Sequence, residues 1–582
     1  MKRIIVSLLA CATFWACAQD DAAGKEDNWD SDKAYLNVCI SEAGSATRAT
    51  AGDPNDFENG TEHKVRTARF FFYDANKMFI TEANVWNDGK PTNPDQNVEF
   101  KGNSVIVLRG LTDVSFPKYL VTVLNAPEGF DHETTLDAMR EKLVAAPESF
   151  HASDYFTMTT TSFAGQKDAS GAELPYFVTE VSRDHFATGP IEAEGTTPVT
   201  VYVERLAAKV TLRVSDDLKT TAENGRYKLN VSVAGSPNDS DDEQAPIKPG
   251  ATDIYVEFQG WGLNATAKSS FLMKNIDETW ENSDASLGTG WKWNDPDNYR
   301  SYWAMSYNYG KDNYPENAGD ASTEGDGLDS EASAYLKYIS SKELDNVFGS
   351  SDYCMENTNT AAIAANRAAR TSVLLKAKIC DKDGKALDMV RYNGILYYRP
   401  SYKAYVLSRL DLNAYYADGT NTDGSTKYTQ IDVPYVHLVN VGDGQVIVQL
   451  RDELPTDIYS IAKGTGVATK ITDYTNLNET MASFNEGNPA IGYNGGEMYY
   501  NIPIEHLRNN AADDKEVYEA NYGVVRNHHY VVSVNSLTTV GKGIFEPDEV
   551  IVPDPDDEGD TYYVGADINV LSWKIVDQNV DL

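Results

Sequence analysis

Segments in which apolar and polar residues alternate recur along this sequence. In the first of them, residues 34–41, every second side chain is apolar: Ala34, Leu36, Val38 and Ile40. Comparable segments, separated by turn-forming residues, lie at 104–111, 119–127, 199–214, 227–235, 372–381 and 527–537. Because a period of two residues is that of a half-buried strand, the pattern predicts an all-β fold built from packed sheets.

Length and composition extend this prediction to two domains. The chain has 582 residues, of which 41% are hydrophobic and 35 are tyrosine, a residue that suits pleated and half-buried surfaces. Single hydrophobic cores stop growing near roughly 250 to 300 residues. We therefore expect two tandem β-sandwich domains, at residues 49–220 and 221–552, with the boundary near 215–226.

One short helix is expected within the first domain. The segment from Thr134 to Ala146 places Leu136, Met139 and Leu143 at helical spacing, with a threonine available as N-cap. We expect these three apolar side chains to face the core.

The charge balance excludes several classes of partner. A formal net charge of −38 opposes binding to nucleic acid or to anionic lipid headgroups.

None of the eight histidines has the spacing of a zinc motif, and His528 and His529 are adjacent on a predicted strand, so they point to opposite faces. We find no nucleophile elbow or phosphate-binding loop. The sequence thus predicts a protein that is not an enzyme and has no cofactor or metal.

Acidic loops are expected at 236–246 and 317–333. Their spacing matches no EF-hand, so we interpret them as solvated loops, with calcium binding as the alternative.

The N-terminus resembles a lipoprotein signal peptide. Two positive charges precede an apolar run that ends at Cys17 after a small residue, and this run is too short to span a bilayer. We assign residues 1–17 as the signal peptide and Cys17 as the lipidated cysteine, with Cys11 as the alternative. The acidic residues 18–32 are expected to form a solvated tether.

Of the remaining cysteines, Cys354 and Cys380 are interpreted as small buried residues, with one disulfide as the alternative.

A loop that proteases can reach follows the first strand. Residues 42–60 are small, polar and rich in glycine, and they contain a single arginine, Arg48. Strand 34–41 and this loop are grouped with the tether as a propeptide, residues 18–48.

The C-terminal segment needs burial on two faces. An extended linker rich in Pro and Asp at 552–560 precedes residues 562–582. Alternation places one apolar set on each side of this strand: Leu571, Trp573 and Ile575, and Ile568, Val570 and Val576. We assign residues 553–582 as a linker and a strand that is donated to another molecule. The alternative is that this strand folds back on its own domain.

Eight segments in order resemble the fimbrillin, or type V pilin, family of Gram-negative anaerobes, most closely the shaft subunit of their short (minor) fimbriae. They are Cys17, GSATRATAGD around Arg48, VERLAAKV at 203–210, NYRSYWA at 298–304, YCMENT at 353–358, MYYNIPIEHLR at 498–508, YGVVRNHHYVVSV at 522–534 and VLSWKIVDQNVDL at 570–582.

This resemblance implies two transthyretin-like β-sandwich domains and a strand that is exchanged. The precursor would be exported to the outer membrane as a lipoprotein, and an arginine-specific protease would cut between Arg48 and Ala49. The cut would remove the strand that carries Leu36, Val38 and Ile40, and the C-terminal strand of another subunit would fill the groove. The implied partners are copies of the same chain and the tip and anchor subunits of a fimbrium that supports adhesion and biofilm formation.

A surface-exposed lipoprotein that binds glycans is the alternative function. It would also show a lipidated cysteine, an acidic tether, β-sandwich domains and many aromatic residues. It would keep Cys17 in the mature protein, whereas a processed pilin would begin at Ala49.

Overall fold

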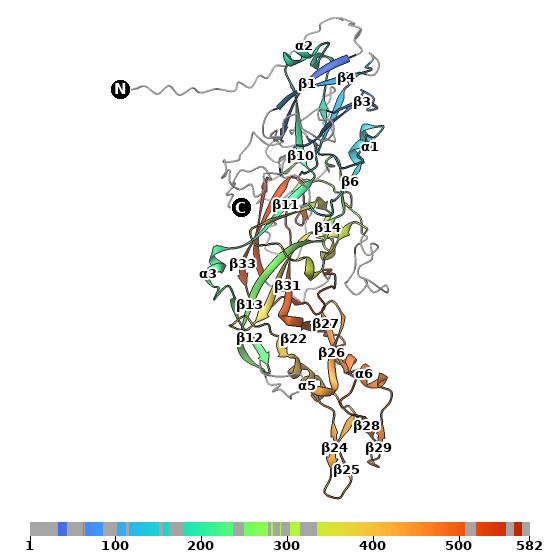
Figure 1. Cartoon of the computed structure of the whole chain (residues 1–582), viewed down its shortest axis with the longest axis vertical. Helices are drawn as coiled ribbons and strands as arrows, with labels where there is room; N and C mark the ends of the chain where they lie inside the picture. The colour runs from blue at the N-terminus through green and yellow to red at the C-terminus, as the bar shows by residue number, and fades with distance from the viewer. Residues whose placement is uncertain are drawn as a thin grey trace, which may run out of the picture.

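The protein is elongated and consists mostly of β-strands, which confirms the all-β prediction (Figure 1). A computed structural model describes residues 33–42, 62, 65–84, 102–111, 116–150, 155–161, 178–236, 249–276, 281–282, 291–292, 303–312, 314, 334–506, 520–553 and 564–572. The N-terminal strands lie at one end of the long axis, and the hairpin of β24 (Tyr415–Thr420) and β25 (Thr426–Gln430) lies at the other.

A nine-stranded sheet forms the N-terminal end. Its main path is β3-β2-β5-β7-β10-β1-β4, and β8 and β9 pair with β5 and β1. The strands are β1 (Lys33–Glu42), β2 (Ala68–Tyr73), β3 (Phe79–Asn84), β4 (Gly102–Arg109), β5 (Tyr119–Leu124), β7 (Met158–Thr161), β8 (Thr179–Glu180), β9 (Phe186–Ala187) and β10 (Val199–Arg205). One hydrophobic core, which includes Phe70, Leu120 and Val201, is shared by these strands.

Two further sheets, of six and ten strands, enclose the second core. The six-stranded sheet runs β18-β14-β19-β11-β33-β35, and its strands are β11 (Ala207–Val214), β14 (Thr266–Ala267), β18 (Leu336–Lys337), β19 (Ser351–Met355), β33 (His528–Leu537) and β35 (Val564–Ser572). The ten-stranded sheet runs β26-β27-β30-β22-β23-β12-β13-β21-β31-β34. Val210 and Val532 of the first sheet pack in the same core as Leu229 and Leu375 of the second, as in a sandwich.

The strands of the ten-stranded sheet are β12 (Tyr227–Ala234), β13 (Pro249–Asn264), β21 (Ser372–Cys380), β22 (Met389–Tyr392), β23 (Ile395–Tyr398), β26 (Val436–Gly442), β27 (Gln445–Leu450), β30 (Ala490–Tyr493), β31 (Glu497–Pro503) and β34 (Lys542–Gly543). Smaller sheets pair β6 (Leu143–Ala145) with β15 (Ser269–Phe271), β16 (Glu281–Asn282) with β17 (Trp291–Lys292), and β20 (Asn357–Thr358) with β32 (Gly523–Val524). The α-helices are α1 (Leu136–Glu141), α2 (Pro190–Glu194), α3 (Asp216–Thr220), α4 (Ala361–Ala364), α5 (Arg399–Arg409) and α6 (Thr475–Ala482).

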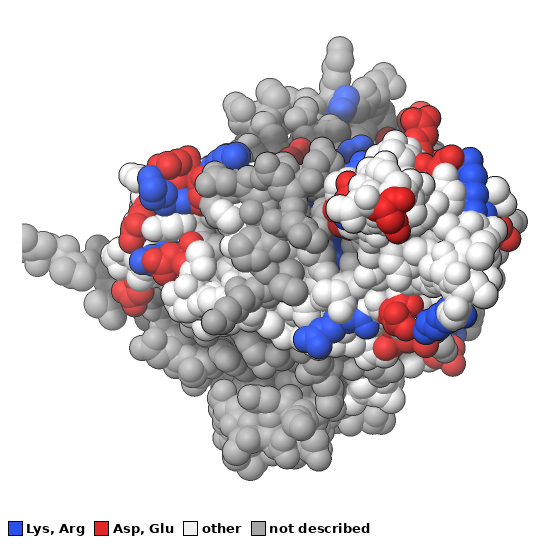
Figure 2. Space-filling model, turned by 90° about the horizontal axis from the view of Figure 1, so that it is seen from below, with Lys and Arg blue, Asp and Glu red and all other residues white. Residues whose placement is uncertain are grey.

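A four-stranded sheet of β25, β24, β28 (Ile458–Ile461) and β29 (Ala468–Lys470) forms the far end. Figure 2, which views the protein from this end, shows acidic and basic side chains in small mixed groups. Lys427 pairs with Asp418 and Lys470 with Asp457, each at 2.8 Å. Charges on this sheet are thus balanced locally.

The predicted helix is confirmed in part. Helix α1 begins after Thr135, whose hydroxyl accepts a hydrogen bond from the N–H of Ala138, and Leu136 and Met139 are fully buried. The prediction for Leu143 is wrong, because its side chain is 51% exposed. The helix ends at Glu141, and Leu143 instead begins strand β6, where helical spacing no longer applies.

The segment 199–214 forms two strands in different sheets. Strand β10 ends at Arg205 and β11 begins at Ala207, so the chain changes sheets at Leu206. This crossover precedes the boundary that we place near 215–226, and the division into two domains stays a prediction.

The three described cysteines, Cys39, Cys354 and Cys380, are buried, and the last two are free, as the sequence indicated for them. Burial raises the pKa of Cys380 to about 11 and holds that of Cys354 well above its usual value. Among the described residues, no helix has the length and apolar content needed to cross a membrane.

Candidate strand-exchange site

Strand β1 lies inside its sheet, with a strand on each side (Figure 1). It pairs antiparallel with β4 from Lys33 opposite Arg109 to Ile40 opposite Gly102. On its other side the first half pairs with β9, and the second half runs parallel to β10 up to Glu42 opposite Val203. The sequence predicts this strand and strands at 104–111 and 199–214, but it does not predict that they pair, because they are far apart in the chain.

One face of β1 is buried as the alternation predicts, and the other face is buried as well. Ala34, Leu36 and Val38 are fully buried in the N-terminal core, and Ile40 is partly buried against it. On the opposite face Asn37 and Cys39 are only 3% and 7% exposed, because α2 and the segment after it lie against this face. The Asn37 side chain donates to the carbonyl oxygen of Thr196 over 3.3 Å. The strand is therefore buried on both faces, whereas the sequence predicts a half-buried one.

Loss of β1 would leave two open sheet edges. Among the described strands β1 is the only one that pairs with β4, so β4 would be separated from the sheet, and β10 would keep β7 alone. Unpaired backbone groups and bared apolar side chains are both unfavourable in water. For Leu36 and Val38, exposure costs about 1.5 to 3 kcal/mol each. An empty slot at this position would favour the binding of another strand.

The C-terminal tail forms β35, which lies at the edge of the six-stranded sheet. It pairs antiparallel with β33, placing Ile568 opposite Val532, Val570 opposite Tyr530 and Leu571 opposite His529. In the isolated chain the tail thus lies on its own domain, as in the fold-back alternative. It occupies an edge position with one strand partner among the described strands.

Several predicted site residues lie outside the described residues: Cys17, Arg48, Ala49, Trp573, Ile575 and Val576. Lipidation, cleavage and strand donation at these positions therefore stay predictions.

Buried charges that sequence reasoning missed surround the crossover between the sheets. Glu204 accepts from Lys274 at 3.3 Å, and Lys209 donates to Glu62 at 2.9 Å, with all four side chains nearly inaccessible. The segment VERLAAKV contains Glu204 and Lys209, which could have drawn attention because charged residues stand there in an otherwise apolar strand pair. Their partners are distant in sequence and could not be identified.

His529 lies beside this cluster, on β33. Its Nε2 is 2.8 Å from the Thr211 hydroxyl. Burial lowers the pKa of His529 to about 3, and the positive charges of Lys209 and Arg213 act in the same direction, against the opposing effect of Glu62. The ring is therefore neutral at physiological pH.

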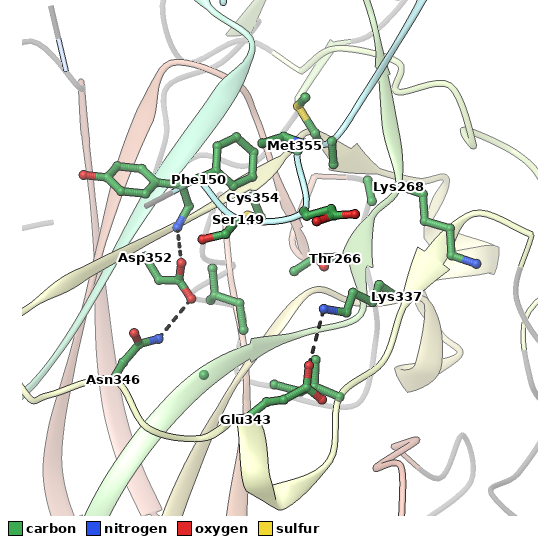
Figure 3. Close-up of a pocket in the computed structure, with 18 of the residues that line it drawn as sticks. Ser149, Phe150, Thr266, Lys268, Lys337, Glu343, Asn346, Asp352, Cys354 and Met355 are labelled. Atoms are coloured by element: carbon green, nitrogen blue, oxygen red, sulfur yellow. Dashed lines mark hydrogen bonds and ion pairs between the residues drawn. The ribbon is translucent and has the colours of Figure 1, made fainter. Parts of the chain in front are cut away.

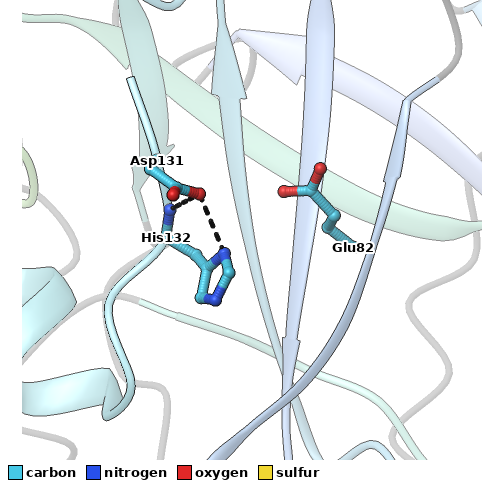
Figure 4. A group of neighbouring side chains, drawn as sticks. All are labelled: Glu82, Asp131 and His132. Atoms are coloured by element: carbon cyan, nitrogen blue, oxygen red, sulfur yellow. Dashed lines mark hydrogen bonds and ion pairs between the residues drawn. The ribbon is translucent and has the colours of Figure 1, made fainter. Parts of the chain in front are cut away.

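Two other features of the described part of the chain, a cavity and a group of polar side chains, resemble binding sites. A cavity of about 570 Å³ lies beside β14 and β19, and three of the charged side chains that line it have partners: Lys337 pairs with Glu343, and Asp352 accepts from Asn346 (Figure 3). Glu82, Asp131 and His132 lie close together (Figure 4). However, Glu82 binds Arg69 at 2.6 Å and Asp131 binds His132 at 3.0 Å, so we assign no metal site there.

Comparison with known proteins identifies the C-terminal region. Residues 492–579 match the family described as "Major fimbrial subunit protein type IV, Fimbrillin, C-terminal". The C-terminal region is thus similar to the fimbrillin family. The matched region includes β33 and β35, the strand pair that holds the tail. No curated protein matches the chain.

Solved structures of fimbrial proteins resemble the chain distantly. A fimbrilin from Porphyromonas gingivalis W83 has 14% identity and a TM-score of 0.37, with 93% of this chain and 98% of that chain covered. A C-terminally truncated tip fimbrial protein from Porphyromonas gingivalis has 10% identity and a TM-score of 0.30, with coverage of 93% and 100%. A fimbrial assembly protein from Parabacteroides distasonis has 10% identity and a TM-score of 0.25, with coverage of 75% and 98%. All three scores are below 0.5, so we base no conclusion on them.

Proposed function

We propose that this chain is the shaft subunit of a cell-surface fimbrium and that cleavage after Arg48 activates it for polymerisation by strand exchange. One observation carries the proposal. Strand β1 precedes Arg48 in the chain, whereas β4, β9 and β10, the strands that hold it, all follow. After a cut at Arg48, only non-covalent contacts would keep β1 in its slot, and another strand could replace it.

The tail is a suitable replacement. Strand β35 has nine residues and β1 has ten. In its own chain β35 pairs with β33 alone, whereas the slot of β1 offers β4 on one side and β9 and β10 on the other. Transfer therefore exchanges one ladder of hydrogen bonds for two, each bond contributing about 0.5 to 1.5 kcal/mol. Insertion into a neighbouring subunit would link successive copies into a polymer.

The fimbrillin family match of the C-terminal region supports a fimbrial role at the cell surface. The precursor would reach the outer membrane through a lipid on Cys17, and cleavage would release the subunit from that lipid. Within the fimbrium its partners would be copies of itself and the tip and anchor subunits, in support of adhesion and biofilm formation.

The test treats purified precursor with an arginine-specific protease and examines the product by negative-stain electron microscopy. Full-length precursor should form fibres only after cleavage at Arg48, and a chain that ends before residue 562 should be cut but stay monomeric. An Arg48→Gln variant is the matched control and should stay uncut and monomeric. Fibres that form without cleavage, or monomers in every sample, would contradict the proposal.

A further inference from the structure

The same strand, β10, contacts the described residues on both sides of Arg48. At its start, Glu42 of β1 lies opposite Val203 of β10. At its end, the backbone oxygen of Glu62 accepts a hydrogen bond from Arg205 Nε of the same strand, over 2.9 Å. Glu42 and Glu62, the described residues on either side of Arg48, are therefore held two positions apart along β10. A cut between these two points separates two chain ends that are each fixed to that strand.

Glu62 is held by a buried set of polar groups. It is 1% exposed, and its Oε1 accepts from Lys209 Nζ at 2.9 Å and from the Tyr353 hydroxyl at 2.5 Å. Lys209, Tyr353 and Arg205 are 4%, 6% and 2% exposed. Glu62 is thus bound to three strands, β10, β11 and β19, that belong to two different sheets.

Among the described residues, Glu62 is the acidic residue that forms an ion pair with Lys209. Lys209 lies directly opposite Tyr353 across the β11–β19 ladder, so both donors come from rigid, paired strands. A buried lysine without its carboxylate is strongly unfavourable, which makes release of Glu62 costly. The position of Glu62 is therefore defined by the folded body and does not depend on β1.

A second arginine lies four residues after Glu62. The side chain of Arg66 is exposed, while its backbone N–H donates to Asn125 Oδ1 at 2.7 Å. A protease needs several residues of extended, detached backbone around the bond it cuts. Attachment at Glu62 on one side and at Asn125 on the other keeps the Arg66 bond out of that state.

We infer that Glu62 anchors the new N-terminal end of the processed subunit and thereby restricts arginine-specific cleavage to Arg48. This inference rests on the proposed function. The anchor separates the part of the chain that departs, β1, from the part that must remain, the start of β2. Cleavage after Arg66 would remove Glu62 and its contact with Arg205 of β10, one of the strands that would receive the donated tail.

The test compares Glu62→Ala and Lys209→Met with the wild-type precursor during digestion by an arginine-specific protease. Products are followed by intact mass and N-terminal sequencing. Wild type should give one new N-terminus within the first 70 residues, at Ala49. Both variants should give a second product that begins at Thr67, formed about tenfold faster or more than in wild type. Lys209→Met removes the charge but keeps an unbranched side chain only one heavy atom shorter, and it serves as the second variant if Glu62→Ala does not fold.

Glu128→Ala is the matched control, since Glu128 is an exposed glutamate in the same N-terminal region. It should give the wild-type pattern. If the folded variants give Ala49 as their only new terminus, the anchor role is overturned while the proposed function stands. If wild type itself is not cut at Arg48, the proposed function fails first, and the two failures are distinguishable.

Discussion

Arg526 and Glu356 form an ion pair of 3.3 Å in which neither side chain has any exposed surface. Arg526 also donates to the carbonyl oxygens of Phe271 and Leu272 and to the hydroxyl of Ser270. One side chain, in the turn before β33, therefore connects the end of β15 with the residue that follows β19. Together with Lys209 and Glu62, it places fully desolvated charges where the chain passes from one sheet to the next.

Removal of either partner of the Arg526–Glu356 ion pair should strongly destabilise the folded protein. Glu356→Ala leaves a buried guanidinium without its carboxylate, and we expect a loss of about 3 to 5 kcal/mol in the free energy of unfolding. Urea denaturation followed by tryptophan fluorescence measures this loss. Lys337→Ala breaks an exposed pair with Glu343 while the Ser340 N–H still donates to Glu343, and it should cost less than about 1 kcal/mol. Equal losses in the two variants would show that burial does not determine the effect.

Leu36→Ala should destabilise the precursor but not the processed subunit. Leu36 is fully buried in β1, and a cavity at such a position costs about 2 to 5 kcal/mol. Because cleavage removes β1, the same substitution should not change the stability of fibres made from the cut protein. Denaturation midpoints of precursor and fibre measure both effects.

The control for this substitution is Val107→Ala, on the neighbouring strand β4. Val107 is 39% exposed, so its truncation should change stability by no more than about 0.5 kcal/mol in either form. A destabilised fibre in Leu36→Ala would mean that β1 stays in the mature subunit.

The alternation of residues predicted where strands lie but not which strands pair. Leu36 and Val38 were assigned to a buried face because a period of two residues is a local property. The neighbours of β1 could not be assigned, since pairing of strands distant in sequence leaves no local pattern. Glu356 and Arg526 are separated by 170 residues, and nothing near either one indicates the other. The prediction for Leu143 was wrong for a related reason. Its spacing fits a helix, but Leu143 pairs with β15, and the helix ends before this residue.

Acid should destabilise the protein through His529. Its pKa is about 3 in the folded state, against about 6.5 in an unfolded chain, so the unfolded state binds the extra proton between these values. Stability therefore falls as pH decreases below 6.5, by about 2 kcal/mol between pH 6.5 and pH 5 from this group. His529→Gln should show a shallower decrease over the same range, measured by urea denaturation at each pH. An unchanged slope would show that His529 is protonated in the folded protein.

The tail should protect strand β33 in the uncut monomer. In the isolated chain β35 is paired along β33 from His528 to Leu537, and β11 pairs with the other side of β33. Alternate backbone N–H groups of an inner strand point to opposite neighbours. Deletion of residues 564–582 should therefore leave about half of the β33 amides without partners and increase their hydrogen exchange about tenfold or more.

Strand β21, which pairs with β13 and β31 on its two sides, is the internal control and should keep its protection in the truncated chain. The same measurement on fibres tests where the tail goes. Transfer of β35 to a neighbouring subunit would free the β33 edge and protect β4 and β10 in its place, because the tail would occupy the slot between them. If β33 keeps full protection in the fibre and no other strand covers its edge, the tail has remained on its own domain, and donation of β35 is excluded.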